Sequence, residues 1–495
     1  MNSPVDPPFP FLHLDKNSST PIYLQLVDGI IQAIQLGHFV HGYQLPGTRQ
    51  FAKDLGLNRN TVVKSLEELA ALGWIDIRPN KGTYIRNQSH KIAHLKTVKN
   101  DDRNGQKAGF PIYTSYLLDQ EKICESALTQ LHLNQGLPDS RLVQYHEAYK
   151  AYHHIAKRKI GKPQQDTNAH RYFVKQILNY LALSRQLYFH EDQIHFVSNR
   201  ALALHLISKL LFQPADQIGV HTMNEQFSNL IFQSHGIKLY PIQLSENGFD
   251  LSKLEEMMVN ATTKAIYLLP LHLYPTAQPV PPQSLKELVA LAKEHQIALI
   301  EDEPYASFYY THRPLPSINA QFPNDQTITL GQIGDGLPSL FHLNYIVGPS
   351  DFIAECKKLS SIYEEVLDPF LLETASTLIK EGELLRIERK HRKIYRERRE
   401  RLGNRLRQTF GDSIQLQMPL MGLGLWLEWK IPLNLLQLKK DAFEKGLVIP
   451  QHLLYQTKKL TGIRIGFGTL NDEEIDQVVD ILSACVDLQL KKLRL

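Results

Sequence analysis

Residues 327–348 read TITLGQIGDGLPSLFHLNYIVG, in which two short apolar runs, TITLG and NYIVG, stand on either side of a loop. Similar runs precede them along the chain, separated by helical stretches: QIHFVS, QIGVH, KLYPIQL, KAIYLLP and IALIED. Such alternation is typical of a mainly parallel β-sheet that is covered by helices on both faces. The sequence over residues 121–495 therefore predicts an α/β domain, and its functional groups should gather where the strands end.

The composition indicates a soluble globular protein of two or three domains. The chain has 495 residues, 43% of them hydrophobic and 21% charged, and no apolar run approaches the roughly 18 residues of a membrane span. The N-terminal residues MNSPVDPPFPFLHLD lack the basic region of a signal peptide. Cys124, Cys356 and Cys485 form no C-x-x-C pair, which argues against a zinc site and for a reducing compartment. We expect a cytoplasmic protein with no membrane partner and no metal site, whose cysteines are small buried hydrophobes.

The excess positive charge lies at the N-terminal end of the chain. Residues 1–110 hold 13 Lys and Arg against 9 Asp and Glu, and this net charge of +4 equals that of the whole chain. A basic terminal module on a neutral body favours a polyanionic partner at that end.

Residues 21–85 contain three helical patterns followed by a hairpin pattern. PIYLQLVDGIIQAIQLGHF has apolar residues near helical spacing. In the next pattern we expect Thr48 to be the N-cap of a helix that Gly56 ends, and Asn58 to cap a third helix. Val62, Leu66 and Leu69 should face inward from that third helix. WIDIRPNKGTYI alternates apolar and polar residues around a turn, so the whole segment predicts a winged helix-turn-helix.

The stretch LPGTRQFAKDLGLNRNTVVKSLEELAALGWIDIRPNKGTYI, residues 45–85, resembles the DNA-binding domain of GntR-family bacterial regulators. The resemblance implies DNA contacts from the start of the second helix, the start of the third helix and the wing tip. These positions are Arg49, Asn58, Arg59, Asn60, Thr61, Lys64, Lys81, Gly82 and Thr83. A helix of this size fits the major groove of double-stranded DNA. A winged helix used for protein contact is the alternative interpretation.

The segment after the winged helix is expected to be a tether. Residues 86–109 lack sustained periodicity and carry six basic and two acidic residues. We assign residues 1–85 to the DNA-binding domain, 86–120 to a flexible linker and 121–495 to the α/β domain. A basic strap that touches DNA phosphates is the alternative for the linker.

Taken together, residues 20–490 resemble MocR-type regulators, in which a GntR module is joined to a fold-type I aminotransferase-like domain. NQGLPDSRL, PLHLYPTAQ, IEDEPYASFYYTHRPLPSI and GIRIGFGTLNDEEI match segments of that family. The resemblance implies that Asp302 meets the pyridine nitrogen of pyridoxal phosphate (PLP), that Tyr305 meets its phenolic oxygen, and that Arg464 grips a substrate carboxylate. Structural interpretations compete with these: a loop cap for Asp302, a core aromatic for Tyr305 and an ion pair for Arg464.

The opening stretch lacks the lysine that the family uses to hold PLP. In the aligned register Asp335 takes the place of the lysine and His342 that of a phosphate-binding arginine, and no lysine stands between Lys293 and Lys357. A carboxylate cannot form an aldimine, so we expect no covalent PLP and no catalytic residue. Asn199-Arg200-Ala201 replaces the family's usual phosphate cup, and Tyr274 replaces an asparagine. Arg200 could still meet an anion, so non-covalent binding of PLP or an amino acid is the alternative.

LLRIERKHRKIYRERRERLGNRLRQTF, residues 384–410, is basic and helical. Glu388 and Glu397 each precede an arginine by four residues, Arg392 and Arg401, which is the spacing of ion pairs along one helix face. We expect a solvated, salt-bridged helix here rather than a second DNA-binding element.

The sequence thus predicts a DNA-binding regulator with a pseudo-aminotransferase domain. That domain either dimerises only or also senses a small-molecule effector. The resemblance further implies a homodimer in which each winged helix rests on the partner's large domain, in a head-to-tail domain swap. A linker of about 25–35 residues spans roughly 25–35 Å, which is enough for this exchange. A two-fold dimer predicts a DNA operator with two half-sites.

Overall fold

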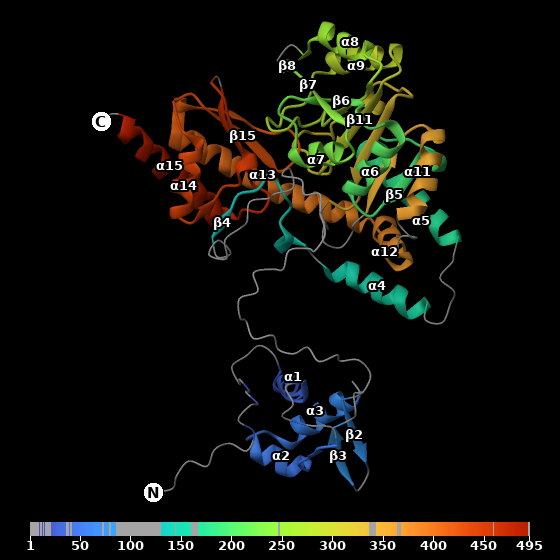
Figure 1. The fold of residues 1–495 in the computed structure, drawn as a ribbon, viewed down its shortest axis with the longest axis vertical. Helices are drawn as coiled ribbons and strands as arrows, with labels where there is room; N and C mark the ends of the chain where they lie inside the picture. Colours follow the sequence, from blue (N-terminus) through green and yellow to red (C-terminus); the bar gives the residue numbers. More distant parts are fainter. Residues whose placement is uncertain are drawn as a thin grey trace, which may run out of the picture. The chain divides into compact units, whose positions relative to one another are not determined.

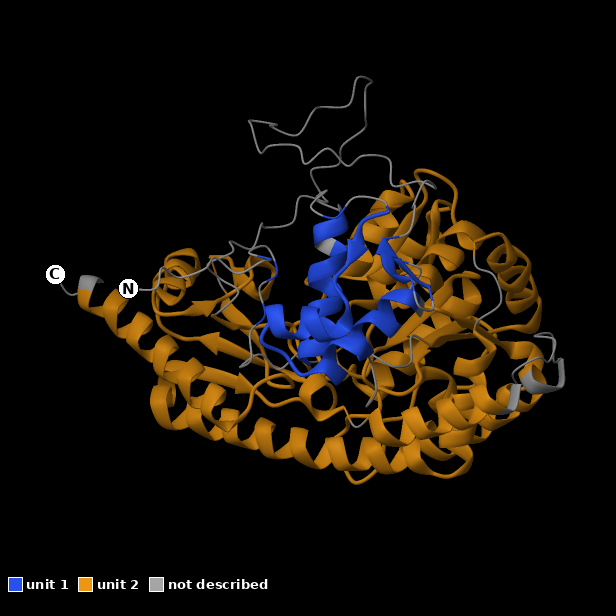
Figure 2. Ribbon diagram, turned by 90° about the horizontal axis from the view of Figure 1, so that it is seen from below, with its two compact units in different colours: residues 1–113 blue, residues 114–495 orange. Residues whose placement is uncertain are grey.

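The computed structural model divides the chain into two compact units, residues 1–113 and 114–495, which are coloured separately in Figure 2. This division falls inside the predicted linker. The structure describes residues 9, 12, 14, 21–35, 39, 42–71, 74–78, 81–85, 130–143, 145–159, 167–245, 248–335, 343–363, 368–458 and 460–493. The linker, Cys124 and His342 therefore lie outside the described residues.

The first unit is a small helical domain with a three-stranded antiparallel sheet of order β1-β3-β2, shown in blue in Figure 1. Its elements are α1 (Ile22–Gln35), β1 (Gln44–Leu45), α2 (Thr48–Asp54), α3 (Arg59–Ala71), β2 (Ile75–Arg78) and β3 (Gly82–Ile85). The order of helix, helix-turn-helix and hairpin is the one predicted. Val62, Leu66 and Leu69 are buried on the face of α3 that packs against α1, as expected.

The helix ends of this unit follow local capping rules, with one correction. Gly56 has φ +61 directly after the end of α2, a conformation that glycine adopts without strain. Asn58 Oδ1 accepts a hydrogen bond from the backbone N–H of Asn60 at 2.9 Å and so caps α3. The prediction that Thr48 caps α2 is wrong. Thr48 is the first helical residue, and Gly47 occupies the N-cap without a side-chain hydrogen bond.

The second unit is built around a seven-stranded sheet of order β5-β13-β12-β11-β10-β6-β7. All neighbours pair in parallel except β13, which runs antiparallel to both β12 and β5. The apolar runs predicted as strands form this sheet, so the mainly parallel α/β architecture is confirmed. The strands are β5 (Ile194–Val197), β6 (Gln217–His221), β7 (Lys238–Ile242), β10 (Thr263–Leu268), β11 (Ala298–Glu303), β12 (Thr327–Gln332) and β13 (Asn344–Val347).

Helices cover both faces of this sheet, as side-chain alternation along β10 shows. Ala265 and Tyr267 pack in the same cluster as Leu204 and Ile207 of α6. The alternate residue Ile266 packs instead with residues of α8 and α9. Successive side chains of a strand point to opposite faces, so both faces of β10 are buried. The helices of this layer and its flanks are α4 (Tyr145–Lys159), α5 (Thr167–Arg185), α6 (Arg200–Leu211), α7 (Gln226–Ser234), α8 (Leu251–Val259), α9 (Pro282–Glu294), α10 (Ile318–Gln321), α11 (Ser350–Tyr363) and α12 (Pro369–Lys380).

A second lobe follows at the C-terminal end, orange and red in Figure 1. Its four-stranded antiparallel sheet has the order β14-β15-β18-β17. Its elements are α13 (Glu383–Phe410), β14 (Ile414–Gln417), β15 (Gly424–Trp429), α14 (Leu435–Glu444), β16 (Leu447–Val448), β17 (Leu454–Gln456), β18 (Thr461–Gly466) and α15 (Asp472–Leu493). Two short pairs complete the unit: β16 with β4 (Leu131–His132), and β8 (Leu244–Ser245) with β9 (Gly248–Phe249).

Helix α13 joins the two lobes. Near its start, Leu384 and Ile387 pack in the hydrophobic cluster beside β5 and β13. Further along, Tyr395, Leu402 and Leu406 pack in the cluster of the second lobe. One continuous helix of 28 residues therefore belongs to two separate cores.

The predicted ion pairs along α13 are wrong. Glu388 is buried and accepts from Tyr180 Oη at 2.5 Å rather than from Arg392. Arg392 lies over the Tyr309 ring, 3.8 Å from its centroid. Arg401 pairs with Asp476 of α15 at 2.6 Å. Because one face of the helix is buried, several of its charged side chains find partners on neighbouring elements, while Arg386 pairs with Glu383 along the helix itself.

Two of the cysteines fit the expectation of small buried hydrophobes. Cys356 and Cys485 are both buried and free. No helix among the described residues is both long and apolar enough to cross a membrane.

Candidate functional site

The start of α3 presents a polar surface. Arg59, Asn60 and Lys64 are exposed, and Thr61 is half-buried beside them. The Lys64 ammonium lies 3.7 Å from the centroid of the Tyr23 ring on α1, a cation–π contact that holds its stem against the domain. The structure thus brings these predicted residues together within the first two turns of α3.

Arg49 and Asn58 border this turn. Arg49 is the second residue of α2 and is exposed. Arg59 Nε donates to Thr48 Oγ1 at 3.5 Å, which links the starts of α2 and α3. The amide oxygen of Asn58 is engaged in capping α3, so its role in the structure is to begin the helix.

The wing is the turn between β2 and β3. Lys81 is exposed, and its carbonyl accepts from Tyr84 Oη at 2.8 Å and from Gln44 Nε2 at 3.2 Å. Gly82 has φ +110, and a Cβ there would lie 2.5 Å from Gln44 Nε2, so the turn requires glycine. Thr83 pairs with Ile77 across the hairpin.

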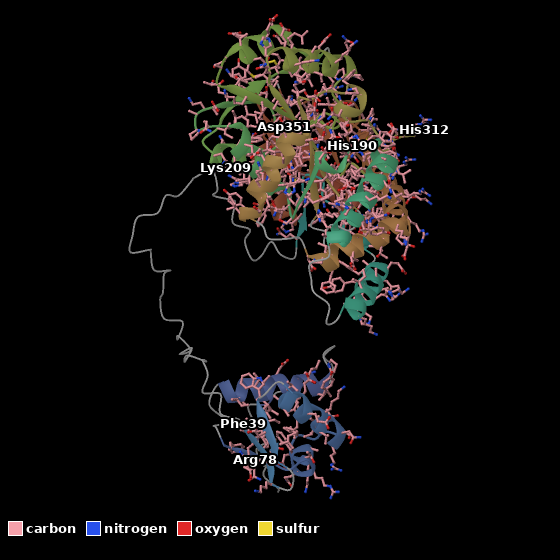
Figure 3. The ribbon with its side chains drawn as sticks, turned by 90° about the vertical axis from the view of Figure 1, so that its right-hand side faces the viewer. Phe39, Arg78, His190, Lys209, His312 and Asp351 are labelled. Carbon is pink, nitrogen blue, oxygen red and sulfur yellow. The ribbon has the colours of Figure 1, made fainter. Side chains whose placement is uncertain are left out.

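Arg78 belongs to this surface, although the sequence-based prediction missed it. It is exposed at the end of β2 and lies 4.9 Å from the Tyr84 ring centroid (Figure 3). Two features of the sequence could have identified Arg78. It lies an odd number of residues after the apolar Ile75 and so faces the other side of the strand, and it stands beside the predicted turn.

A second candidate site lies in the α/β unit, at the ends of the central strands. A cavity of about 480 Å³ is lined by four of the predicted pocket residues, namely Arg200, Tyr274, Tyr305 and Arg464. Its walls also include residues that follow strands, such as Asn199 after β5 and Pro304 after β11. This agrees with the expectation that functional groups gather at the strand ends.

Asp302, Arg200 and Glu225 form one charged network at the inner end of this cavity. Asp302 Oδ2 accepts from Arg200 Nε at 2.6 Å and from Tyr267 Oη at 2.7 Å. Arg200 Nη2 donates to Glu225 Oε2 at 2.6 Å and to Tyr267 Oη at 2.7 Å. Burial raises the pKa of Asp302, and the Arg200 charge opposes that rise. Asp302 is therefore an ion-pair partner and not merely a loop cap.

Glu225 and Tyr267 were missed by the sequence-based prediction. Glu225 follows β6 and so stands at a strand end, which was a usable signal. Tyr267 lies inside β10, where an apolar run gives no indication of a polar role.

Arg464 is enclosed at another wall of the cavity. Its Nε donates to the Gln135 carbonyl and its Nη1 to the Pro275 carbonyl, both at 2.7 Å. Its guanidinium lies 4.9 Å from the centroid of the Tyr274 ring. Arg464 is only 4% exposed, and burial lowers its pKa. Among the described residues its partners are carbonyls and an aromatic ring, so the ion-pair interpretation of Arg464 is wrong.

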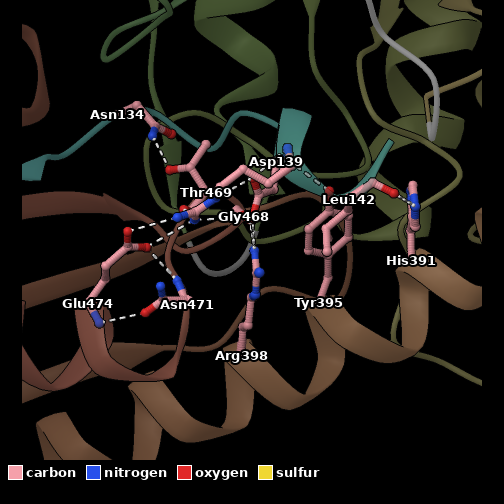
Figure 4. Close-up of polar contacts among 11 residues, drawn as sticks. Asn134, Asp139, Leu142, His391, Tyr395, Arg398, Gly468, Thr469, Asn471 and Glu474 are labelled. Atoms are coloured by element: carbon pink, nitrogen blue, oxygen red, sulfur yellow. Dashed lines mark hydrogen bonds and ion pairs between the residues drawn. The ribbon is translucent and has the colours of Figure 1, made fainter. Parts of the chain in front are cut away.

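The segment that carries Gln135 is fixed by a polar network, drawn in Figure 4. Asp139 accepts from Arg398 Nη1 at 2.9 Å, and its N–H donates to Tyr395 Oη at 3.0 Å. Arg141 joins Asp139 to Glu474 of α15, with Arg141 Nη1 2.8 Å from Glu474 Oε1. This network holds the segment of the NQGLPDSRL motif against α13 and α15.

Asp335 is not among the residues that line the cavity. Its side chain is buried, and Oδ2 accepts from the Ser307 backbone N–H at 3.1 Å. Burial raises the pKa of Asp335 to about 6 and that of Glu388 to about 7. Nearby, Arg185 Nη2 forms a buried ion pair with Glu303 Oε2 at 2.7 Å. Asp335, which the sequence analysis aligned with the family's lysine, thus belongs to a buried polar layer.

Two family profiles match the chain. One, described as "Bacterial regulatory proteins, gntR family", matches residues 22–85, and the other, "Aminotransferase class I and II", matches residues 128–333. Among curated relatives, the HTH-type pyridoxine biosynthesis transcriptional regulator PdxR of Corynebacterium glutamicum is 24% identical over 96% of this chain and 98% of its own. The Uncharacterized HTH-type transcriptional regulator YdeL of Bacillus subtilis (strain 168) is 23% identical over 95% and 98%. The Probable rhizopine catabolism regulatory protein MocR of Rhizobium meliloti is 22% identical over 78% and 77%.

Solved structures with the same fold include aminotransferases. The kynurenine aminotransferase of Pyrococcus horikoshii superposes with a TM-score of 0.65 at 19% identity, over 73% of this chain and 92% of its own. LysN, the α-aminoadipate aminotransferase of Thermus thermophilus, superposes with a TM-score of 0.63 at 20% identity, over 74% and 94%. The profiles and the fold together describe a DNA-binding regulator: residues 22–85 match the gntR-family profile, and the second unit has an aminotransferase fold. Within that class, the relatives of this chain include regulators of the PdxR and MocR kind.

Proposed function

We propose that this regulator binds operator DNA through α3 and the wing, and that its aminotransferase-like domain forms no covalent adduct with PLP. The observation that carries the DNA-binding part is the exposed basic turn of Arg59 and Lys64, flanked by Arg49 and the wing residue Lys81. A helix can enter the major groove, where guanidinium and ammonium groups reach base edges and phosphates. The chromosome is the partner, which places the proposed action in the cytoplasm.

Operator binding is tested by selection from random DNA. Duplexes are selected from a random DNA pool on the purified full chain, and their affinity is measured by fluorescence anisotropy. We expect selected duplexes with two related half-sites, and an affinity that falls steeply with salt because phosphate contacts release counterions. Equal affinity for selected and random duplexes would remove sequence-specific regulation from the proposal.

The residues of the pocket do not fit covalently held PLP. An aldimine needs an amine, and the chain has no lysine between Glu294 and Cys356. Asp335, which is in register with the family's lysine, is a buried carboxyl group that does not line the cavity. The start of α6 is also engaged, since Asn199 Oδ1 accepts from the Leu202 N–H at 2.8 Å. The pocket therefore supports a role other than covalent catalysis.

Borohydride reduction tests this part of the proposal. The purified chain is mixed with PLP, reduced and digested, and the peptides are mapped by mass spectrometry. We expect adducts only on exposed surface lysines such as Lys209, with none on peptides that line the cavity. A pyridoxyl-lysine within the cavity would contradict the proposal.

Non-covalent recognition of a small carboxylate is the second candidate role for the large domain. Arg464 favours it, because a buried guanidinium lines the cavity and donates its hydrogen bonds at Nε and Nη1 to neutral carbonyls. Thermal-shift screening of amino acids and dicarboxylates tests this role, because a ligand of the folded state raises the melting temperature by mass action. Shifts that vanish in Arg464→Gln would support effector sensing. A flat screen would favour a domain that only dimerises.

The proposal includes a homodimer with exchanged winged helices. Its support is the likeness to MocR-type regulators together with the length of the predicted linker, residues 86–120. Light scattering and crosslinking with mass spectrometry test it. We expect a dimer at micromolar concentration and crosslinks between the winged helix and the large domain of the other chain, distinguished by isotope-labelled mixed dimers. A monomer, or crosslinks within one chain only, would contradict this arrangement.

A further inference from the structure

We propose that Arg200 is a built-in replacement for the ring nitrogen of a pyridine cofactor, and that it closes the inner end of the pocket to PLP and pyridoxamine phosphate even without a covalent bond. The proposal goes beyond the loss of the aldimine, because it concerns non-covalent binding. It does not depend on DNA binding.

The carboxylate that would receive the pyridine nitrogen is already engaged. Asp302 Oδ2 accepts from Arg200 Nε at 2.6 Å and from Tyr267 Oη at 2.7 Å. Asp302 is only 2% exposed, so a protonated ring nitrogen can take the place of the cationic donor at this oxygen only by displacing Arg200. An N–H of the guanidinium thus provides the cationic donor that a protonated ring nitrogen would provide.

Arg200 is held from its other side as well, so it does not swing away freely. Its Nη2 donates to Glu225 Oε2 at 2.6 Å and to Tyr267 Oη at 2.7 Å. Its guanidinium also lies 5.2 Å from the centroid of the Phe227 ring. Glu225 is 6% exposed, and displacing Arg200 would leave two buried carboxylates without their shared cation. A buried carboxylate without a cationic partner is strongly unfavourable, so the arrangement in which Arg200 bridges Asp302 and Glu225 is the stable one.

The space beside Asp302 is too small for a ring. A cavity of about 20 Å³ is bounded by Arg200, Asp302, Gly331 and Tyr345. A volume of this size holds one water molecule, and an aromatic ring is several times larger. The larger cavity of about 480 Å³, which Arg200, Tyr274 and Arg464 line, does not have Asp302 among its lining residues.

These observations assign Arg200 a role in specificity. A ligand of the larger cavity is recognised without contact to Asp302, so a phosphorylated pyridine loses the interaction that orients its ring. A ligand that contacts Arg464 and Tyr274 does not need Asp302, so the Arg200–Asp302 pair does not affect its binding.

The experiment uses pyridoxamine 5′-phosphate, which has no aldehyde and cannot react with surface lysines. Its binding to the full chain is measured by equilibrium dialysis and by thermal shift. The main variant is the double substitution Arg200→Ala with Glu225→Gln, which removes one positive and one negative charge and leaves Asp302 available. The matched control is Tyr267→Phe, which removes the other donor to Asp302 and keeps Arg200 in place.

We expect no saturable binding to the wild-type chain or to Tyr267→Phe at millimolar ligand, and at least a tenfold gain in affinity in the double variant. Guanidinium ion at non-denaturing concentration should compete with the ligand in that variant, because it refills the vacated position. Arg200→Lys is the second variant, should the double variant not fold. Its shorter side chain keeps the charge but cannot bridge both carboxylates, so we expect a smaller gain.

Two results would overturn the proposal: saturable binding to the wild-type chain with the affinity of the variants, or folded variants that bind no better than wild type. Operator affinity is measured on the same samples. A failure of the DNA-binding proposal would appear there as a loss of sequence-specific binding, whereas a failure of the Arg200 proposal leaves operator affinity unchanged.

Discussion

The dipeptide Asn-Arg begins two helices of this chain, α3 and α6, and the two arginines have opposite surroundings. In both places the asparagine caps the helix: Asn58 Oδ1 accepts from Asn60 N–H at 2.9 Å, and Asn199 Oδ1 from Leu202 N–H at 2.8 Å. Arg59 is exposed, whereas the side chain of Arg200 is 20% exposed and bridges two carboxylates. The local sequence decides where each helix starts, and the tertiary partners decide what each arginine can do.

The comparison distinguishes two uses of the same chemistry. A guanidinium at a surface keeps its donors available for a partner, while a guanidinium between buried carboxylates contributes to stability and specificity inside the fold. Replacing Arg200 should therefore reduce stability and leave DNA binding unchanged, whereas replacing Arg59 should reduce DNA binding and leave stability nearly unchanged.

The largest expected effect is on stability. Arg200→Ala leaves Asp302 and Glu225 buried without their cation, so we expect the α/β unit to lose about 3–5 kcal/mol of unfolding free energy. Arg59→Ala removes an exposed side chain, and its cost should stay within about 0.5 kcal/mol. Denaturant unfolding followed by circular dichroism measures both. Similar costs for the two variants would break the comparison.

A further effect on stability depends on pH and concerns Asp335. Its folded-state pKa of about 6 lies above the usual aspartate value, so the folded state binds the proton more tightly than the unfolded state. Wild-type stability should therefore fall as pH rises from about 4 through 6, by about 3 kcal/mol from this group. Asp335→Asn cannot ionise and should become the more stable protein, relative to wild type, at pH 8.

The measurement is the melting temperature of both proteins between pH 4.5 and 8. The exposed Asp351 of α11, labelled in Figure 3, supplies the control, because Asp351→Asn should leave the wild-type pH profile unchanged. Parallel profiles for wild type and Asp335→Asn would show that Asp335 does not titrate in this range.

The next effect is on DNA binding, where the variants of α3 should lose affinity and the variant of the pocket should not. Arg59→Ala should weaken binding of the selected operator by about 1–3 kcal/mol, as expected for a side chain that contacts a base. Lys64→Ala should weaken binding by about 1 kcal/mol, because the Lys64 ammonium already lies over the Tyr23 ring. The double variant Arg200→Ala with Glu225→Gln should bind operator as wild type does. Fluorescence anisotropy gives the affinities, with Lys209→Ala on the surface of the large domain as the control. Unchanged affinity in both α3 variants would exclude this helix from recognition.

The smallest expected effect concerns the basic helix α13. Arg401 and Arg405 pair with Asp476 of α15, with the nearest atoms 2.6 and 3.0 Å apart, and all three side chains are partly exposed. Exposed pairs contribute little, so replacing both arginines by alanine should cost at most about 1 kcal/mol of stability. Operator affinity and its salt dependence should not change. A lower salt slope in this variant would identify α13 as a second DNA-binding surface.

The fold was largely predictable because its signals are local. Each apolar run of the central sheet is bounded by polar residues, and Asn58 and Gly56 have the side chains that a helix start and a helix end require. The strands of the second lobe were not predicted, although GLWLEW forms β15. Thr48 was misassigned because Gly47 takes the N-cap position without a side-chain bond.

The site was less predictable because its contacts join distant parts of the chain. Arg200 and Asp302 are 102 positions apart, and nothing in either segment indicates that they pair. Glu388 illustrates the same limit. Its spacing to Arg392 suggested a surface pair, but tertiary packing buries it against Tyr180. The family resemblance pointed to four residues that line the cavity, while the pairing of Arg200 with Asp302 required the three-dimensional structure.

The position of α13 in two hydrophobic cores has a consequence for hydrogen exchange. A helix of 28 residues is roughly 42 Å long, and its two halves are protected by different clusters. An amide near its middle can exchange only when the helix frays past one cluster or when both clusters open. The slowest amides of α13 therefore report the cooperativity between the lobes: equal opening energies along the helix mark one unfolding unit, and a step near its middle marks two.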